Sequence, residues 1–155
     1  MKKLTIDQAT GRCFLCGRDN PIGPGLEFFL DPADPPQIVT RWTPGPEYSG
    51  QGTILHGGFQ AGLLDEIMGW AAHHLAGRPG VTQTISVDFL CPVHVGRPLE
   101  ARGRMLSREG PKVHLEAELV DRSGNVCARA RGTYHLLDED RFLRLSHPDK
   151  EPADP

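Results

Sequence analysis

The sequence predicts an α+β domain in which a single long helix lies against one face of an antiparallel sheet. Residues 57–77 carry apolar side chains at helical intervals, whereas the segments after residue 80 alternate between apolar and polar side chains. Turns rich in glycine and proline separate these segments. A doubly wound parallel sheet does not fit, because it needs a helix between successive strands. A sheet with one apolar face covered by a helix does fit.

Two early strands are predicted at residues 26–31 and 37–43, where aromatic and β-branched residues dominate short runs bounded by proline and glycine. We expect them to form a hairpin. The long helix follows, from Gly57 to about Gly77, with no proline inside it and a glycine at its far end.

The remaining strands are predicted at residues 81–90, 98–107, 112–121 and 125–137. In the first of them Val81, Ile85, Val87 and Phe89 alternate with polar residues, which is typical of a half-buried strand. The segments REGPK and DRSGN read as turns, so the last three strands should form a meander.

Charged residues of opposite sign follow the outward face of this meander, with acids on its middle strand and bases on both neighbours. Cross-strand ion pairing explains the pattern. The alternative is that the arginines bind the phosphates of a nucleotide carrier, but surface charges normally pair in this way, and we assign no site to them. The residues concerned are Glu100, Arg102, Arg104, Glu116, Glu118, Arg129 and Arg131.

Length and charge restrict the class of protein. The chain has 155 residues, enough for one domain with its own core, which we expect at residues 1–140, with residues 1–24 as an entry segment and residues 141–155 as a polar tail. Lys and Arg number 17 against 20 Asp and Glu, so there is no general basic field to bind nucleic acid or an anionic membrane. The first residues lack the apolar stretch of a secretory signal, and we therefore expect a cytoplasmic protein with reduced thiols.

The most informative segment begins at His56-Gly57-Gly58, where a glycine-rich turn runs directly into the helix. The N–H groups of a first helical turn have no partner inside the helix, and the positive end of the helix dipole lies there. Such a place can hold an anion, or an oxygen that becomes an anion during acyl transfer. An isolated HGG would more simply be a plain helix start with a structural histidine.

Asp65 favours a functional interpretation of this segment over a purely structural one. It lies two turns into an otherwise apolar helix, on a stripe that includes Gly58, Gly62 and Gly69. A carboxylate in apolar surroundings is costly unless it is hydrogen-bonded or used, so Asp65 is a candidate base or nucleophile. Glu66, one step round the helix, has bulkier neighbours and is the second candidate.

Gly57 and Asp65 are eight residues apart, about 12 Å along a helix axis. An oxyanion donor and a base must both come within roughly 3 Å of the reacting group. One helix cannot place both at the same carbonyl. If both act, Gly57 of one protomer meets Asp65 of another across a two-fold axis, and the protein is a dimer or a higher oligomer such as a tetramer.

Three segments, HGGFQAGLLDEIMGWA, VTQTISVDFLCPVHVGRPLEARGRM and DRSGNVCARARGTYHL, resemble the hot-dog thioesterases of the phenylacetate-pathway (PaaI-like) and 4-hydroxybenzoyl-CoA type. The likeness covers roughly residues 49–137, and the opening CFLCGRDNPIGPGLEF is similar to a subset of these proteins. The resemblance implies a hot-dog fold, one long central helix wrapped by a curved antiparallel sheet of five to six strands. It also implies homodimers with a shared sheet and hydrolysis of an acyl-CoA thioester without a metal or cofactor.

The resemblance further implies roles for single residues. The Gly57 N–H would polarise the thioester carbonyl, Asp65 would activate water or attack directly, and His56 would shape the pocket entrance. Thr82 occupies the place of an assisting Ser or Thr, although simple alternation puts it on the strand face opposite Val81 and Ile85. Gly50 stands where some members carry an amide side chain, with Gln51 beside it; the substrate-binding candidates are Gly50, Gln51, Gly58, Phe59 and Glu66.

Cys13 and Cys16 have metal-ligand spacing, but the sequence shows no second pair, and structural cysteines in a turn are the preferred interpretation, so no metal site is predicted. Two other functions remain open. A hot-dog hydratase or dehydratase would want a histidine paired with the carboxylate, and His56 is badly placed for that. A non-catalytic acyl-CoA binding or sensing protein is supported by the glycine at position 50.

Overall fold

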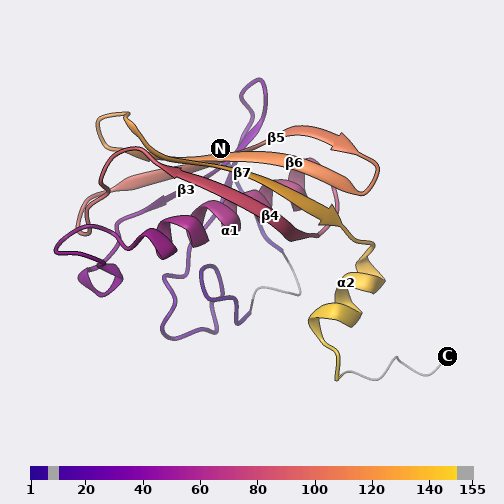
Figure 1. Ribbon diagram of the computed structural model, residues 1–155. Coiled ribbons are helices and arrows are strands. Elements are labelled where there is room, and N and C mark those ends of the chain that lie inside the picture. Colours follow the sequence, from indigo (N-terminus) through magenta and orange to yellow (C-terminus); the bar gives the residue numbers. More distant parts are fainter. Residues whose placement is uncertain (7–10, 150–155) are drawn as a thin grey trace.

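In the computed structural model, which describes residues 1–6 and 11–149, a strongly curved sheet wraps around one long helix, α1 (Gly57–Leu75) (Figure 1). The seven strands are antiparallel to their neighbours and lie in the order β1-β2-β3-β5-β6-β7-β4. Their bounds are β1 Lys2–Lys3, β2 Phe29–Asp31, β3 Gln37–Trp42, β4 Gly80–Phe89, β5 Leu99–Glu109, β6 Lys112–Asp121 and β7 Val126–Leu136. A short 3-10 helix, η1 (Pro46–Tyr48), precedes α1.

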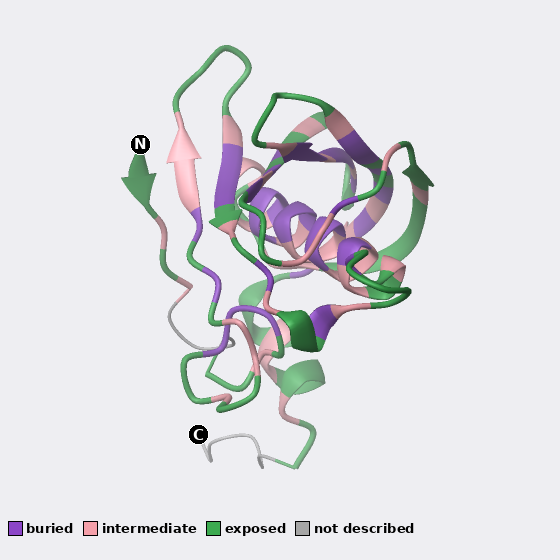
Figure 2. Cartoon of the chain, turned by 90° about the vertical axis from the view of Figure 1, so that its left-hand side faces the viewer, coloured by how far each residue is buried: buried purple, intermediate pink, exposed green. Residues whose placement is uncertain are grey.

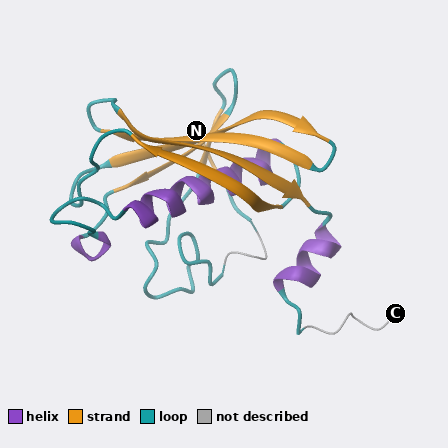
Figure 3. Ribbon diagram, in the orientation of Figure 1, coloured by secondary structure: helices purple, strands orange, loops and turns teal. Residues whose placement is uncertain are grey.

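The predicted fold class is confirmed, and the predicted elements are found close to their expected bounds (Figure 3). Strands β2 and β3 form the expected hairpin, and β5, β6 and β7 form the expected meander. The sheet exceeds the expected five to six strands because Lys2–Lys3 pairs with Phe29 and Leu30 as a short additional strand. Strand β4 pairs with β7 and so lies at the far end of the sheet, with its other side unpaired among the described residues.

The core lies between α1 and the inner face of the sheet (Figure 2). Leu63, Leu64, Ile67 and Met68 of the helix are fully buried there. Gly103 of β5 lets the helix come close: a Cβ atom at this position would lie 3.0 Å from the backbone oxygen of Ile67. The sheet is therefore in near contact with the helix only two residues beyond Asp65.

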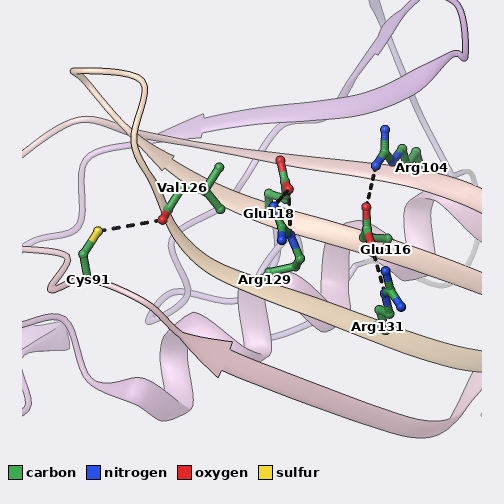
Figure 4. A network of polar contacts seen from close by, with 7 residues as sticks. All are labelled: Cys91, Arg104, Glu116, Glu118, Val126, Arg129 and Arg131. Atoms are coloured by element: carbon green, nitrogen blue, oxygen red, sulfur yellow. Dashed lines mark hydrogen bonds and ion pairs between the residues drawn. The ribbon is translucent and has the colours of Figure 1, made fainter.

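The outward face of the meander carries the predicted cross-strand ion pairs (Figure 4). Glu116 accepts from Arg104 Nη2 at 2.6 Å and from Arg131 Nε at 3.1 Å, and Glu118 accepts from Arg129 Nη2 at 2.6 Å. Two of the arginines thus neutralise a single carboxylate of β6 from the strands on either side.

The polar tail predicted from residue 141 begins with a helix, α2 (Glu139–Ser146). Asp138 caps it by accepting a hydrogen bond from the Arg141 N–H at 2.7 Å, and acidic residues in the first turn favour the helix dipole. The run Asp138-Glu139-Asp140 is a sequence signal typical of such a helix start. Residues 150–155 of the predicted tail lie outside the described residues. Within the described part of the chain, neither helix is long and apolar enough to cross a membrane.

Candidate active site

The start of α1 leaves one backbone donor available. His56 caps the helix, its Nδ1 accepting from the Gly58 N–H at 2.9 Å, while its backbone oxygen accepts from the N–H groups of Phe59 and Gln60. The Gly57 N–H is the remaining donor of this turn, and it has no hydrogen-bond partner among the described residues. His56 therefore acts as a helix cap, which commits one ring nitrogen, and Gly57 is the free amide.

Asp65 is half-buried and is held by two hydroxyl groups. The Tyr134 hydroxyl donates to Asp65 Oδ1 at 2.6 Å and also lies 2.9 Å from the backbone oxygen of Asp65. The Thr82 hydroxyl donates to the same Oδ1 at 2.8 Å. Both donors are neutral, so they orient the carboxylate without pairing its charge. Among the described residues no hydrogen bond occupies Oδ2.

The predicted orientation of Thr82 is wrong, and a β-bulge explains why. The register between β4 and β7 shifts between Thr82 and Thr84, so that Gln83 is an extra residue on β4. Thr82 pairs with Tyr134 and Ile85 pairs with Gly132, and directly paired residues share a face of the sheet. The bulge thus brings Thr82 to the same face as Ile85, which is the face that meets Asp65.

The sequence alone indicates Tyr134 only as one residue of a strand and does not point to a role in the site. The inward positions of β7 are Ala128, Ala130, Gly132 and Tyr134, so a large side chain with a polar tip follows three small ones. A Cβ atom at Gly132 would lie 2.8 Å from the Tyr134 ring, so the glycine makes room for it. Burial first, and then the hydrogen bond to Asp65, raise the pKa of Tyr134, which keeps the phenol protonated as a donor.

Glu66 lies in a different environment from its neighbour. Its carboxylate accepts from the Trp70 indole N–H at 3.1 Å and lies 3.6 Å from the thiol of Cys13 through both oxygens. Burial is the main reason why the pKa of Glu66 is raised to about 7. The structure brings the Cys13–Cys16 pair to this carboxylate, a contact across more than fifty residues that spacing in the sequence could not show.

The other predicted binding residues cluster around the helix start. A Cβ atom at Gly50 would lie 3.2 Å from the Cα atom of His56, so this turn packs tightly on the cap. Gln51 is exposed in the same turn. Phe59 packs edge-on against Tyr48, with ring centroids 4.9 Å apart, and stacks on Phe14 at 6.1 Å. It therefore faces the segment before the helix rather than Asp65.

A cavity of about 230 Å³ joins the two acidic residues. Its wall is formed by α1, the start of β4, the end of β7, α2 and the N-terminal segment. The side chains that carry polar or ionisable groups into its lining are those of Cys13, Cys16, Asp65, Glu66, His73, Thr82 and Tyr134.

A long helix wrapped by a curved antiparallel sheet is the hot-dog thioesterase fold. Residues 52–128 of the chain match the family model described as the thioesterase superfamily. A crystal structure of a thioesterase superfamily protein is 26% identical and superposes with a TM-score of 0.71, over 77% of this chain and 61% of that one. PaaI of Escherichia coli, from the phenylacetic acid degradation operon, has the same fold, with 22% identity and a TM-score of 0.62 over 66% of this chain and 73% of its own.

Among curated proteins, one from Saccharolobus solfataricus named "Putative esterase" is 30% identical over 92 residues, which are 59% of this chain and 65% of that protein. The match thus spans slightly less than two thirds of that relative. The structure of smu.793 from Streptococcus mutans was solved bound to acetyl-CoA; it is 19% identical, with a TM-score of 0.62 over 65% of this chain and 81% of that chain.

Proposed function

We propose that this protein is an acyl-CoA thioesterase that hydrolyses an acyl-CoA to a free acid and CoA, with Asp65 as its working carboxylate. The observation that carries the proposal is the pair of neutral donors on Asp65 Oδ1, Tyr134 and Thr82. They fix the side chain, while Oδ2 keeps its charge and its lone pairs for a water molecule or a carbonyl carbon. A carboxylate used only for structure would more often be paired with a cation, as Glu116 and Glu118 are.

Acyl-CoA as the substrate class is supported by the acetyl-CoA complex of the Streptococcus mutans protein, which shares the fold. A placement in the cytoplasm belongs to the same proposal.

The proposal includes a second subunit. Gly57 and Asp65 lie on one straight helix, and the eight-residue separation of about 12 Å prevents both from reaching one carbonyl. The outer strand β4 offers an edge for pairing with a second copy, and its Val81, Ile85 and Phe89 side chains are exposed by 40%, 38% and 54%. The Phe89 ring also lies next to Gly57, 3.5 Å from where a Cβ atom would be. The free amide and the open edge thus occur at the same side of the subunit.

In the proposed reaction, Asp65 takes a proton from a water molecule while the water oxygen bonds to the thioester carbon. The Gly57 N–H of the other subunit stabilises the resulting oxyanion. Collapse of this intermediate breaks the C–S bond, and the CoA sulfur leaves and takes up the proton that Asp65 had accepted. In the alternative route Oδ2 of Asp65 attacks the thioester carbon and the C–S bond breaks, so that CoA leaves as its thiolate; water then hydrolyses the resulting anhydride to the free acid and Asp65 and protonates the thiolate. A single turnover in ¹⁸O-labelled water separates the two, because the direct route can place the label in Asp65.

A second candidate function, acyl-CoA binding without turnover, is favoured by Gly50. The turn before the helix offers no amide side chain at this position, and the 3.2 Å approach to His56 shows that a side chain would be crowded there. A hydratase is not favoured, because His56 Nδ1 is committed to the helix cap and does not contact Asp65.

The test is steady-state release of CoA thiol from a panel of aromatic and aliphatic acyl-CoAs, together with their binding measured by calorimetry. Turnover by the wild type that is lost in Asp65→Asn supports the thioesterase. Asp149→Asn, the same chemical change at an exposed position, is the matched control. Tight binding with no turnover of any acyl-CoA would instead establish the binding protein.

A further inference from the structure

The Cys13–Cys16 pair and Glu66 form a compact set of metal-ligating groups beside the proposed active site. One ligand atom from each residue lies within 4.8 Å of the others. The Cys13 sulfur is 3.6 Å from both oxygens of Glu66. In a tetrahedral zinc site with Zn–S of about 2.3 Å and Zn–O of about 2.0 Å, a sulfur and an oxygen ligand are about 3.5 Å apart. The existing spacing therefore needs little adjustment to accept an ion.

The turn around Cys13 and Cys16 and its contact with α1 produce this arrangement, and the residues that hold Asp65 take no part in it. The Cys13 backbone oxygen accepts from the Gly17 N–H at 2.9 Å, which closes a turn around the pair. Leu15, inside that turn, is buried, and a Cβ atom at Gly62 of α1 would lie 3.7 Å from it. The turn thus docks on the side of the helix that the sheet leaves uncovered, and this docking brings the cysteines to Glu66 (Figure 1).

The three groups combine two sulfur ligands with a carboxylate; Cys16 is buried, and Cys13 and Glu66 are partly buried. Ion pairs among the described residues involve Glu27, Glu100, Glu116 and Glu118, and none of them reaches Glu66. A carboxylate held in such surroundings without a cationic partner is costly. A divalent ion bound to these three residues would supply the compensating charge.

We propose that Cys13, Cys16 and Glu66 bind a zinc ion through two thiolates and a carboxylate. Thiolate ligands favour zinc over the hard cations magnesium and calcium, and the Cys-x-x-Cys spacing suits a tetrahedral site. The Trp70 indole N–H, 3.1 Å from a Glu66 oxygen, orients the carboxylate as an outer hydrogen bond commonly does for a metal ligand. Three protein ligands leave the fourth position to water.

A zinc ion bound here would tie the N-terminal segment to α1 at Glu66, the residue next to Asp65. It would thereby fix one wall of the cavity that both carboxylates line. The cysteines would bind the zinc ion, whereas Asp65 would carry out the hydrolysis, so the two sites can be tested separately. The proposal does not depend on thioester hydrolysis.

The test is zinc stoichiometry of the untagged full-length protein. The protein is reduced, loaded with excess zinc, dialysed, and analysed by plasma mass spectrometry. We expect one zinc per chain in the wild type, and a loss of affinity of at least about 100-fold in Cys13→Ser and Cys16→Ser, measured against a competing chelator. Glu66→Gln, which keeps the side-chain shape, should weaken binding by about 10–100-fold. Cys91→Ser, at a cysteine outside the cluster, should retain one zinc.

A second measurement guards against variants that simply fail to fold. Cobalt should give a thiolate charge-transfer band in the wild type that is weaker in each single serine variant, while circular dichroism checks that the fold is kept. Zinc well below one per chain in reduced wild type overturns the proposal, as does zinc retained at full affinity by the Cys13→Ser/Cys16→Ser double variant. Asp65→Asn should keep its zinc, so that failure of the metal site and failure of the proposed hydrolysis are told apart.

Discussion

Carboxylates on the two sides of the sheet have different kinds of partner. On the outer face, Glu116 is paired with two arginines and Glu118 with one. On the inner face, Asp65 of α1 is held by hydroxyl groups of two strands, and its neighbour Glu66, on the side of the helix away from the sheet, is held by an indole N–H and the Cys13 thiol. A carboxylate neutralised by arginine is already engaged, whereas one held by neutral donors keeps its charge available. The chemistry of this protein is therefore expected on the inner face.

The largest expected effect comes from Asp65 itself. Replacing Asp65 by Asn keeps the shape and the hydroxyl contacts but removes the charge, and we expect the rate of CoA release to fall by about 10²–10⁴-fold. Glu118→Gln is the control from the outer face and should leave the rate within about twofold. Equal losses from both changes would remove the distinction between the two faces. A larger loss from Glu66→Gln than from Asp65→Asn would assign the working role to Glu66.

The next effect tests the need for a second copy of the chain. Ile85 lies on the edge strand β4, faces inward beside Gly132, and is 38% exposed. A charge there, in Ile85→Asp, should block edge pairing, convert the oligomer to a monomer in analytical ultracentrifugation, and reduce CoA release by about 100-fold or more, since each Asp65 loses its oxyanion donor. Leu145→Asp, an exposed apolar residue on α2, is the matched control. A monomer that keeps its full turnover would contradict the shared site.

A smaller effect is expected at the groups that position Asp65. Tyr134→Phe and Thr82→Ala each remove one donor from Oδ1, and we expect kcat to fall by about tenfold with little change in KM. Thr82→Ser should restore the rate, since it returns the hydroxyl. Combined with Asp65→Asn, neither change should reduce the rate further, because residues acting through one group are not additive. Additive losses would indicate that Tyr134 or Thr82 acts on the substrate directly.

The inner face also shows why the sequence predicted part of the site and not all of it. Asp65 and Gly57 were found because a charge and a glycine-rich start stand out in one helical period. Thr82 was identified by resemblance, but its face was wrong, since a bulge at Gln83 shifts the alternation and depends on how β4 pairs with β7. Tyr134 lies on another strand, and its role appears only through that pairing.

The fold was more predictable than the site for the same reason. Helical and alternating periods are local, and they gave α1 and the strands of the meander directly. The seventh strand, Lys2–Lys3, has no such period and exists only through its pairing with β2. Likewise the sequence shows the Cys13–Cys16 pair as a lone motif, because its partner Glu66 lies on α1, about fifty residues away, and only the docking of the Cys13–Cys16 turn on the helix brings them together.

The smallest expected effect concerns the outer face and is one of stability. Burial alone would raise the pKa of Glu116, but hydrogen bonds and charges from Arg104 and Arg131 outweigh it and hold the pKa below its ordinary value. A lowered pKa in the folded state adds stability at pH values above the unfolded pKa of about 4.3, and this contribution is lost as the pH falls through the folded value.

Glu116→Gln should therefore lower the free energy of unfolding by about 1 kcal/mol at pH 7, a modest amount because both arginines are largely exposed. The difference from the wild type should shrink below about pH 4, measured by urea denaturation at a series of pH values. CoA release by the folded variant should stay close to that of the wild type. A difference in stability that is independent of pH would mean that packing, and not charge, accounts for the contribution of Glu116, and the contrast between the two faces would then be one of shape.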